Sequence, residues 1–216
     1  MSGILKVGGS ELINDNGGSG DLQWGTGVPS GTIVQTQFTQ VTTKSTQTYS
    51  ADTDTPITVL QVNITPHFNN SIIKLECYFM LEYDGSNEMN GSVGFFYRNT
   101  TALGNTDSSA GGSSDPGNRK VGVGTGQIQY WNADANTTPE NYNLTFYDRP
   151  NDGTNAIAQI TYKFGISADA GGTMYINQAG TDSTDNSGYI ERGCSYISAT
   201  EIAQSGNGTI TPAKAS

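Results

Sequence analysis

The strongest constraint on the fold is an alternation of apolar and polar residues, with a period of two, along much of the chain. Between Ile72 and Leu81 every second residue is apolar, and the residues between them include Lys74 and Glu76. The same alternation runs through residues 57–64 and 156–166. Because successive side chains of a strand point to opposite faces of a sheet, this pattern is typical of antiparallel strands with one buried face.

Shorter stretches carry a weaker form of the same pattern, and turn sequences such as Asp84-Gly85 separate them. They are residues 32–38, 41–49, 92–97, 127–131, 142–147, 173–178 and 194–202. A high content of glycine, 28 residues, disfavours helices. We therefore expect an all-β fold, an antiparallel two-sheet jelly-roll-like sandwich of about ten strands, preceded by an extended N-terminal arm.

The sequence divides into three parts: an N-terminal arm (1–30), a jelly-roll-like domain (31–204) and a short C-terminal tail (205–216). The arm holds too little apolar surface to fold alone, so we expect it to dock onto a partner through short apolar anchors. The candidate anchors are Ile4, Leu5, Val7, Leu12, Ile13, Leu22 and Trp24. The stretch 103–126 is rich in glycine and serine and is expected to be a long exposed loop.

The charge of the chain argues against a nucleic-acid partner, and its lack of long apolar runs argues against membrane insertion. Ten basic residues face 20 acidic ones, which gives a net charge of −10, and the basic residues are scattered along the chain. A nucleic-acid partner is therefore not expected, because a phosphate backbone requires clustered Lys and Arg. The sequence predicts neither a signal peptide nor membrane insertion, since no apolar run approaches the ~20 residues of a membrane span.

Few residues suggest chemistry, and we predict no enzyme, no cofactor and no metal site. The one histidine, His67, lies in a turn without an obvious catalytic partner. Three aspartate pairs are candidates for glycosidase carboxylates, and the segment 182–186 for a calcium loop, but turn roles explain these residues better. The pairs are Asp52/Asp54, Asp148/Asp152 and Asp182/Asp185. Cys77 and Cys194 are expected to be buried free thiols, with a disulfide between two strands as the alternative.

Two aromatic residues stand out in the sequence. Tyr130 and Trp131 end an expected strand and lead into a loop rich in Asn and Thr. Rigid aromatic side chains beside amides are typical of surfaces that contact sugars or other subunits. We therefore predict Tyr130 and Trp131 as receptor or subunit contacts, with packing at the end of the sandwich as the alternative.

Five segments spread over residues 29–203 carry a family resemblance. They are PSGTIVQ (29–35), ITPHFNNSII (64–73), FYDRP (146–150), GGTMYIN (171–177) and RGCSYISATEI (192–202). Together they resemble a recurrent type of bacteriophage virion protein, found in tail fibres and related appendages, including those of cyanobacterial and marine phages.

The resemblance implies a jelly-roll-like domain that is commonly trimeric and attaches to the virion through its N-terminal segment. The resulting expectation is a non-enzymatic homotrimer on the exterior of a phage particle, assembled in the host cytoplasm. Its arm would bind other virion proteins, and its β domain would contact the host surface, for example a glycan. A head decoration or cement protein that clamps capsid subunits is the alternative, and a glycan depolymerase is disfavoured by the lack of a catalytic constellation.

Overall fold

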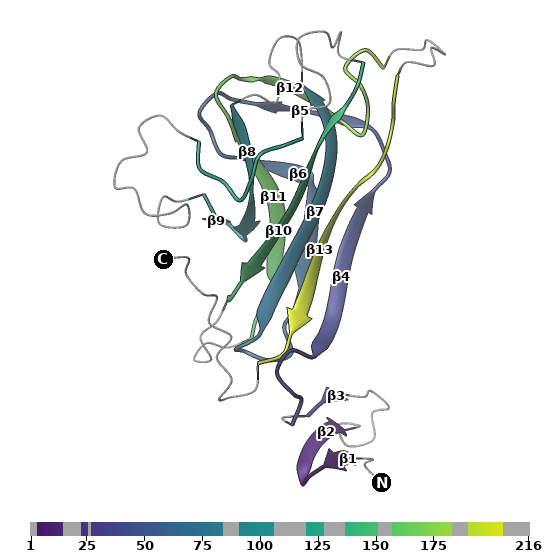
Figure 1. Cartoon of the computed structure of the whole chain (residues 1–216), viewed down its shortest axis with the longest axis vertical. Helices are drawn as coiled ribbons and strands as arrows, with labels where there is room; N and C mark the ends of the chain where they lie inside the picture. The colour runs from purple at the N-terminus through teal and green to yellow at the C-terminus, as the bar shows by residue number, and fades with distance from the viewer. Residues whose placement is uncertain are drawn as a thin grey trace.

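All regular elements in the described residues are β-strands, as seen in a computed structural model of the chain (Figure 1). The residues described are 4–14, 23–25, 27–83, 91–105, 120–127, 137–150, 157–182 and 190–204. Three short strands come first: β1 (Ile4–Val7), β2 (Ser10–Asn14) and β3 (Gln23–Trp24). The strands that follow are β4 (Ile33–Val41), β5 (Ser45–Tyr49), β6 (Thr55–Ile64), β7 (Ile72–Tyr83), β8 (Ser92–Arg98), β9 (Thr101–Leu103), β10 (Glu140–Asp148), β11 (Ile160–Ala168), β12 (Gly172–Ile176) and β13 (Ser195–Ile202).

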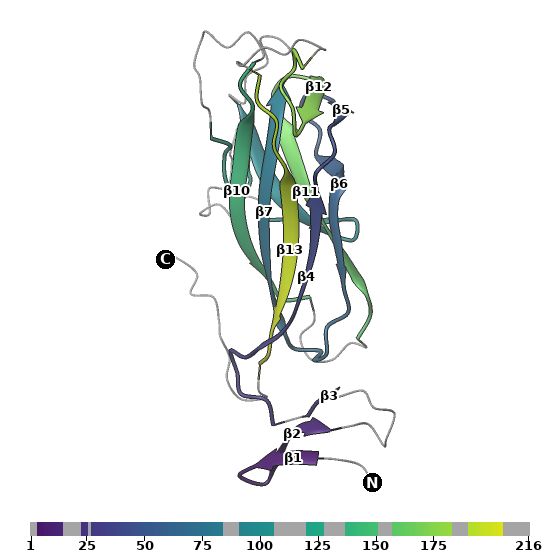
Figure 2. The same ribbon diagram turned by 90° about the vertical axis from the view of Figure 1, so that its right-hand side faces the viewer.

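Strands β4–β13 form two sheets, and the prediction of an antiparallel two-sheet sandwich is confirmed. In the first sheet β7 lies between β10 on one side and β13 and β12 on the other, while β4 borders β13 and β5 borders β12. The second sheet has the order β6-β11-β8-β9. The chain crosses repeatedly from one sheet to the other. Figure 2 shows β10, β7, β13 and β4 side by side, with β11 behind them.

The core lies between the two sheets, in the register that the alternation predicts. The five apolar residues of β7 that point inward are at most 1% exposed, and Phe79 is among them. Its ring meets Phe164 of the second sheet at 5.6 Å, and Phe164 also contacts Tyr142 at 5.4 Å and Phe96 at 5.8 Å between ring centroids. Aromatic rings from both sheets thus interlock, which holds the sheets together.

Several polar groups inside the sandwich are hydrogen-bonded to one another. The hydroxyl of Tyr162 donates a hydrogen bond of 2.7 Å to Asp148, which also accepts two bonds, of 3.0 and 3.1 Å, from Arg98. The hydroxyls of Tyr142 and Ser92 lie 2.7 Å apart. Burial raises the pKa of the phenols of Tyr162 and Tyr142, so both stay neutral and can donate.

The N-terminal segment differs from the extended arm that the sequence suggests. β1 and β2 form an antiparallel hairpin, and β3 pairs with β2 to complete a small sheet. This sheet lies beyond the end of the sandwich at which β4 begins and β13 ends (Figures 1 and 2). The hairpin turns at Gly8 and Gly9, whose φ angles of +58° and +83° favour glycine.

Part of the loop predicted at residues 103–126 packs against the core. Thr101–Leu103 forms β9, and Leu103 and Val123 pack against the core. Gly124 pairs with Gly94 of β8 in an isolated bridge. The expectation of an exposed loop is therefore wrong for residues 120–124, because these residues cover the edge of the core beside β8, whereas residues 106–119 lie outside the described residues.

Candidate functional site

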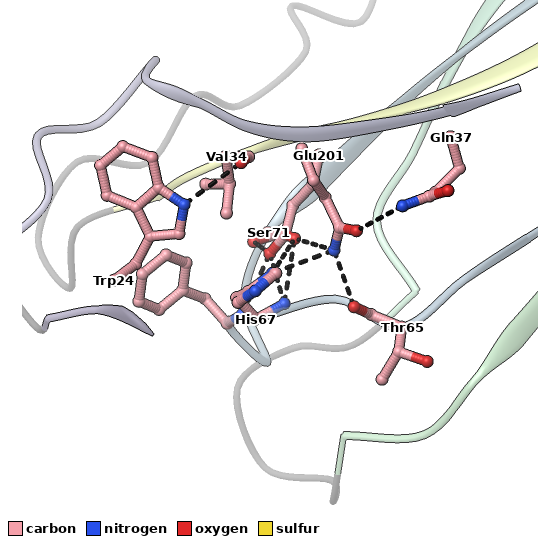
Figure 3. A network of polar contacts seen from close by, with 9 residues as sticks. Trp24, Val34, Gln37, Thr65, His67, Ser71 and Glu201 are labelled. Carbon is pink, nitrogen blue, oxygen red and sulfur yellow. Dashed lines mark hydrogen bonds and ion pairs between the residues drawn. The ribbon is translucent and has the colours of Figure 1, made fainter. Parts of the chain in front are cut away.

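The junction between the N-terminal sheet and the sandwich combines apolar packing with hydrogen bonds. Trp24 packs against a small cluster formed by Val28, Val34 and Ala203, with Phe68 beside it. Its indole N–H donates a hydrogen bond of 3.2 Å to the carbonyl of Val34 in β4. Trp24 belongs to β3, so this single side chain joins the small sheet to the end of the sandwich (Figure 3).

At the same junction, the backbone at Gly27 lies directly against the backbone of β2. The amide of Gly27 donates a hydrogen bond of 2.8 Å to the carbonyl of Glu11 in β2. A Cβ atom at residue 27 would lie 2.6 Å from the Cβ of Ser10, so a larger residue would push β2 away. The glycine therefore allows the connection to the sandwich to run directly against the N-terminal sheet.

Next to Trp24, a buried carboxylate holds the loop between β6 and β7. Glu201 of β13 is 0% exposed, and its carboxylate accepts hydrogen bonds from the backbone amides of His67 at 2.8 Å and Phe68 at 3.0 Å. It also accepts bonds from the Ser71 hydroxyl at 2.7 Å and from the Gln35 side chain at 2.8 Å (Figure 3). One side chain thus connects β13, β4 and the 65–71 loop.

The environment keeps Glu201 ionised. Burial by itself would raise the pKa of Glu201, but the hydrogen bonds from Gln35, the His67 amide, Ser71 and the Phe68 amide outweigh burial and hold this pKa below its usual range. The ionised carboxylate accepts all of these bonds at neutral pH. The network is therefore a charge-assisted clamp at the end of the sandwich.

The same residues include a serine, a histidine and a glutamate, the types used in nucleophilic catalysis, but their arrangement differs from a catalytic relay. The Ser71 hydroxyl donates a hydrogen bond to Glu201, and Ser71 is 1% exposed. The His67 Nδ1 lies 3.2 Å from Glu201, and the structure gives no hydrogen bond between His67 and Ser71. A relay requires the histidine between the nucleophile and the carboxylate, whereas here the carboxylate is the centre.

The predicted docking residues differ in exposure. Ile4 and Leu5 of β1 are 48% and 55% exposed, which leaves them available to a partner. Leu12 and Ile13 of β2 are half-buried. Trp24 is different, because its side chain packs against the end of the sandwich. Val7 lies in β1, whereas Leu22 lies outside the described residues.

Tyr130 and Trp131 also lie outside the described residues, but a different aromatic surface is present. Alternate residues of β4, β13, β7 and β10 point away from the core and form what we call the outer face, which includes Phe38, Tyr196, Tyr78 and Tyr147. Phe38 is 70% exposed, Tyr147 54% and Tyr196 41%. Sequence analysis named none of these four residues as a contact, although aromatic residues at the polar phase of an alternating strand are a recognisable signal.

The carboxylates considered for catalysis or calcium binding are engaged by other side chains. Asp52 pairs with Lys120, and Asp54 accepts a hydrogen bond of 2.7 Å from Asn105. Asp182 is bound by Arg192 at 2.5 and 2.8 Å and by Lys44 at 3.3 Å, and the bonds from Arg192 lower the pKa of Asp182. Asp148 is held by Arg98 and Tyr162, as described above. The remaining members of the pairs, Asp152 and Asp185, lie outside the described residues.

The two cysteines are free and differ in exposure. Cys77 is buried in the core, and burial raises the pKa of its thiol well above the usual range. Cys194 is exposed, so the expectation of two buried thiols is wrong for this residue. The reason is that Cys194 precedes β13 and lies in phase with the outer face, where the side chain of Gln40 meets its sulfur at 3.8 Å.

Comparisons with known proteins leave the family of the chain open. No protein-family model matches the sequence, and no curated protein matches it with significant similarity. In the described ranges, no group of three or more His, Cys, Asp or Glu side chains could hold a metal ion. A search of the same residues finds no helix that could cross a membrane.

Proposed function

We propose that this chain is a non-enzymatic structural protein of a bacteriophage particle. In this proposal it is a trimeric appendage of the tail-fibre type, anchored through its N-terminal sheet to other virion proteins. The sandwich is exposed on the exterior of the particle and contacts the host surface. The family resemblance of residues 29–203 and the jelly-roll-like sandwich both support this reading.

The observation that carries the proposal is the separate N-terminal sheet at one end of the sandwich. Its first strand, β1, presents Ile4 and Leu5, both about half exposed. β1 is also an edge strand among the described residues, where its one partner is β2. An edge with exposed apolar side chains can add to a sheet of a partner and fill pockets with those side chains.

The junction suits an anchor that transmits force or position to the sandwich. Trp24 joins the small sheet to β4, and the adjacent Glu201 clamp joins β4 to β13 and to the 65–71 loop. A partner bound at β1 would therefore be connected to the first sheet of the sandwich through directional hydrogen bonds. A flexible arm would leave the sandwich free to reorient.

Removal of residues 1–22 tests the anchoring role. We expect the truncated protein to keep the thermal midpoint of the sandwich, because Trp24 and Val28 remain and all ten sandwich strands lie beyond the deletion. Its incorporation into phage particles should fall to background, as measured by immunoblotting of gradient-purified particles. The double variant Ile4→Asp with Leu5→Asp should have the same effect, whereas Gln61→Asp on β6 should not.

Two outcomes would contradict this account. Wild-type levels of truncated protein in particles would mean that the N-terminal sheet is not the anchor. Gold labelling of particles with an antibody against the sandwich provides the location: label at the tail supports an appendage, and label over the whole head supports a decoration protein instead.

A further inference from the structure

The outer face of the first sheet is a broad surface that no other described part of the chain covers. It spans four neighbouring strands, β4, β13, β7 and β10, which pair antiparallel with one register shift, between Glu201 and Ile202 of β13. Across it, Phe38 stands beside Ser198, which stands beside Glu76 on the following strand, and the rings of Tyr196 and Tyr78 stack with centroids 6.3 Å apart. Exposed rings on adjacent strands are unusual on a surface that faces only water.

We propose that this outer face is the surface through which copies of the chain associate with one another. The inference rests on the proposed function for the number of copies, three, and goes beyond it in naming the surface. Another copy of this chain covers the outer face. Charge and area argue for that occupant.

Charge restricts where two copies can meet. The chain carries a net charge of −10, so most of its surface repels another copy. Along the stretch of the outer face from Thr36 to Gln40 on β4 and across the neighbouring strands, the charged residues are Lys74 and Glu76, which pair with each other at 2.8 Å. This patch is therefore neutral, and contact there avoids the cost of bringing like charges together.

The size of the face is also suitable. Four strands at their usual spacing, over the nine residues of β4, cover roughly 20 by 30 Å, or about 600 Å² of flat surface. Side chains that project from it add to this area, so the whole face, which a copy in a ring of three divides between its two neighbours, approaches the ~800 Å² that one partner buries in a standard interface. Each of its four strands carries an aromatic side chain, and most of the residues between them are neutral and polar, a composition that resembles subunit interfaces.

Both edges of the face contribute exposed side chains. Phe38 lies on β4 and Tyr147 on β10, at opposite sides of the sheet. Ile33, 63% exposed, extends the apolar surface toward the start of β4. One copy can therefore bring the β4 side of its face against the β10 side of the next, an arrangement that closes into a ring.

Light scattering on the purified full-length chain tests the proposal independently of any particle. We expect the wild type to have three times the monomer mass of 22.8 kDa, about 68 kDa, at micromolar concentration. Phe38→Asp places a charge in the face and should reduce the mass threefold, to that of a monomer. Tyr147→Asp, on the other edge, should do the same, so that the test does not depend on one variant. Gln61→Asp is the matched control, since Gln61 is exposed on β6, the edge strand of the opposite sheet, and it should leave the mass unchanged.

Circular dichroism and thermal melting establish that each variant is folded, as expected for such exposed positions. A Phe38→Asp protein that is folded and still oligomeric would overturn the assignment of the surface. A monomeric wild type would overturn self-association altogether. If that monomer bound a neutral glycan and lost binding on Phe38→Asp, the face would be a sugar site instead. None of these outcomes depends on whether residues 1–22 anchor the chain to a particle, so the two proposals can fail separately.

Discussion

Phe164→Ala is expected to lower the free energy of unfolding by about 3–5 kcal/mol, the range observed when a buried phenylalanine is truncated. Phe164 is 0% exposed and lies at the centre of the sandwich. Its ring contacts Phe79 and Tyr142 of the first sheet and Phe96 of its own sheet. Its loss leaves a cavity between the sheets that three stiff rings cannot easily fill.

Urea denaturation, at a fixed protein concentration because association contributes to stability, measures this effect. Phe79→Ala should cost a similar amount, since Phe79 packs directly against Phe164. Ile157→Ala serves as the control, because Ile157 is 43% exposed and its truncation should change the free energy by less than about 0.5 kcal/mol. Equal and small losses for all three variants would show that the two sheets do not pack as described.

Glu201→Gln is expected to lower the free energy of unfolding at neutral pH by about 2–4 kcal/mol. The carboxylate accepts bonds from two backbone amides, from Ser71 and from Gln35. The glutamine side chain has nearly the same shape, but its NH₂ group is a donor and would face donors. Some of these buried groups would then lose their partner, which is costly.

The effect of Glu201→Gln should depend on pH. The pKa of Glu201 is lowered in the folded protein, so its ionised form stabilises the fold at pH values above the usual carboxyl pKa. This stabilisation is lost as the pH falls through the lowered pKa, and the difference in unfolding free energy between wild type and variant should shrink there. Glu191→Gln, at an exposed position, is the control and should show no such trend. A difference that stays constant down to acidic pH would rule out the ionised clamp.

Period-two alternation predicted the sandwich because strands such as β6 and β7 bury mainly one face. The inward residues of β7 could be assigned from their apolar character alone, and the structure confirms their burial. The pattern was less decisive in β8, where two phenylalanines are adjacent. Phe95 and Phe96 are both 0% exposed, and only the contacts of Phe96 with Phe146 and Phe164 identify it as the member in the core.

Glu201 was not predicted, although the sequence contained a signal for it. Ile197, Ala199 and Glu201 alternate in phase, so an acidic residue occupies a position on the apolar face of β13. A carboxylate at such a position requires buried donors. Those donors lie 130 to 166 residues away in the sequence, at Ser71 and Gln35, and pattern analysis does not pair residues over such distances.

The N-terminal hairpin shows a second limit. Gly8-Gly9 between two short apolar segments is a turn signal for a two-residue hairpin. The strands on either side are so short, and the residues around them so polar, that composition favoured an extended arm. Pairing with β3 and the packing of Trp24 on the sandwich supply stabilisation that no local property of residues 4–14 reveals.

The central claim, that the chain is a structural component of a phage particle, is tested most directly by counting its copies in purified particles. Quantitative mass spectrometry with isotope-labelled peptides from the sandwich gives that number relative to a major structural protein of the same particle. Our account predicts a fixed copy number that is a multiple of three. Particles that lack the chain, or that carry it in variable trace amounts, would contradict the account.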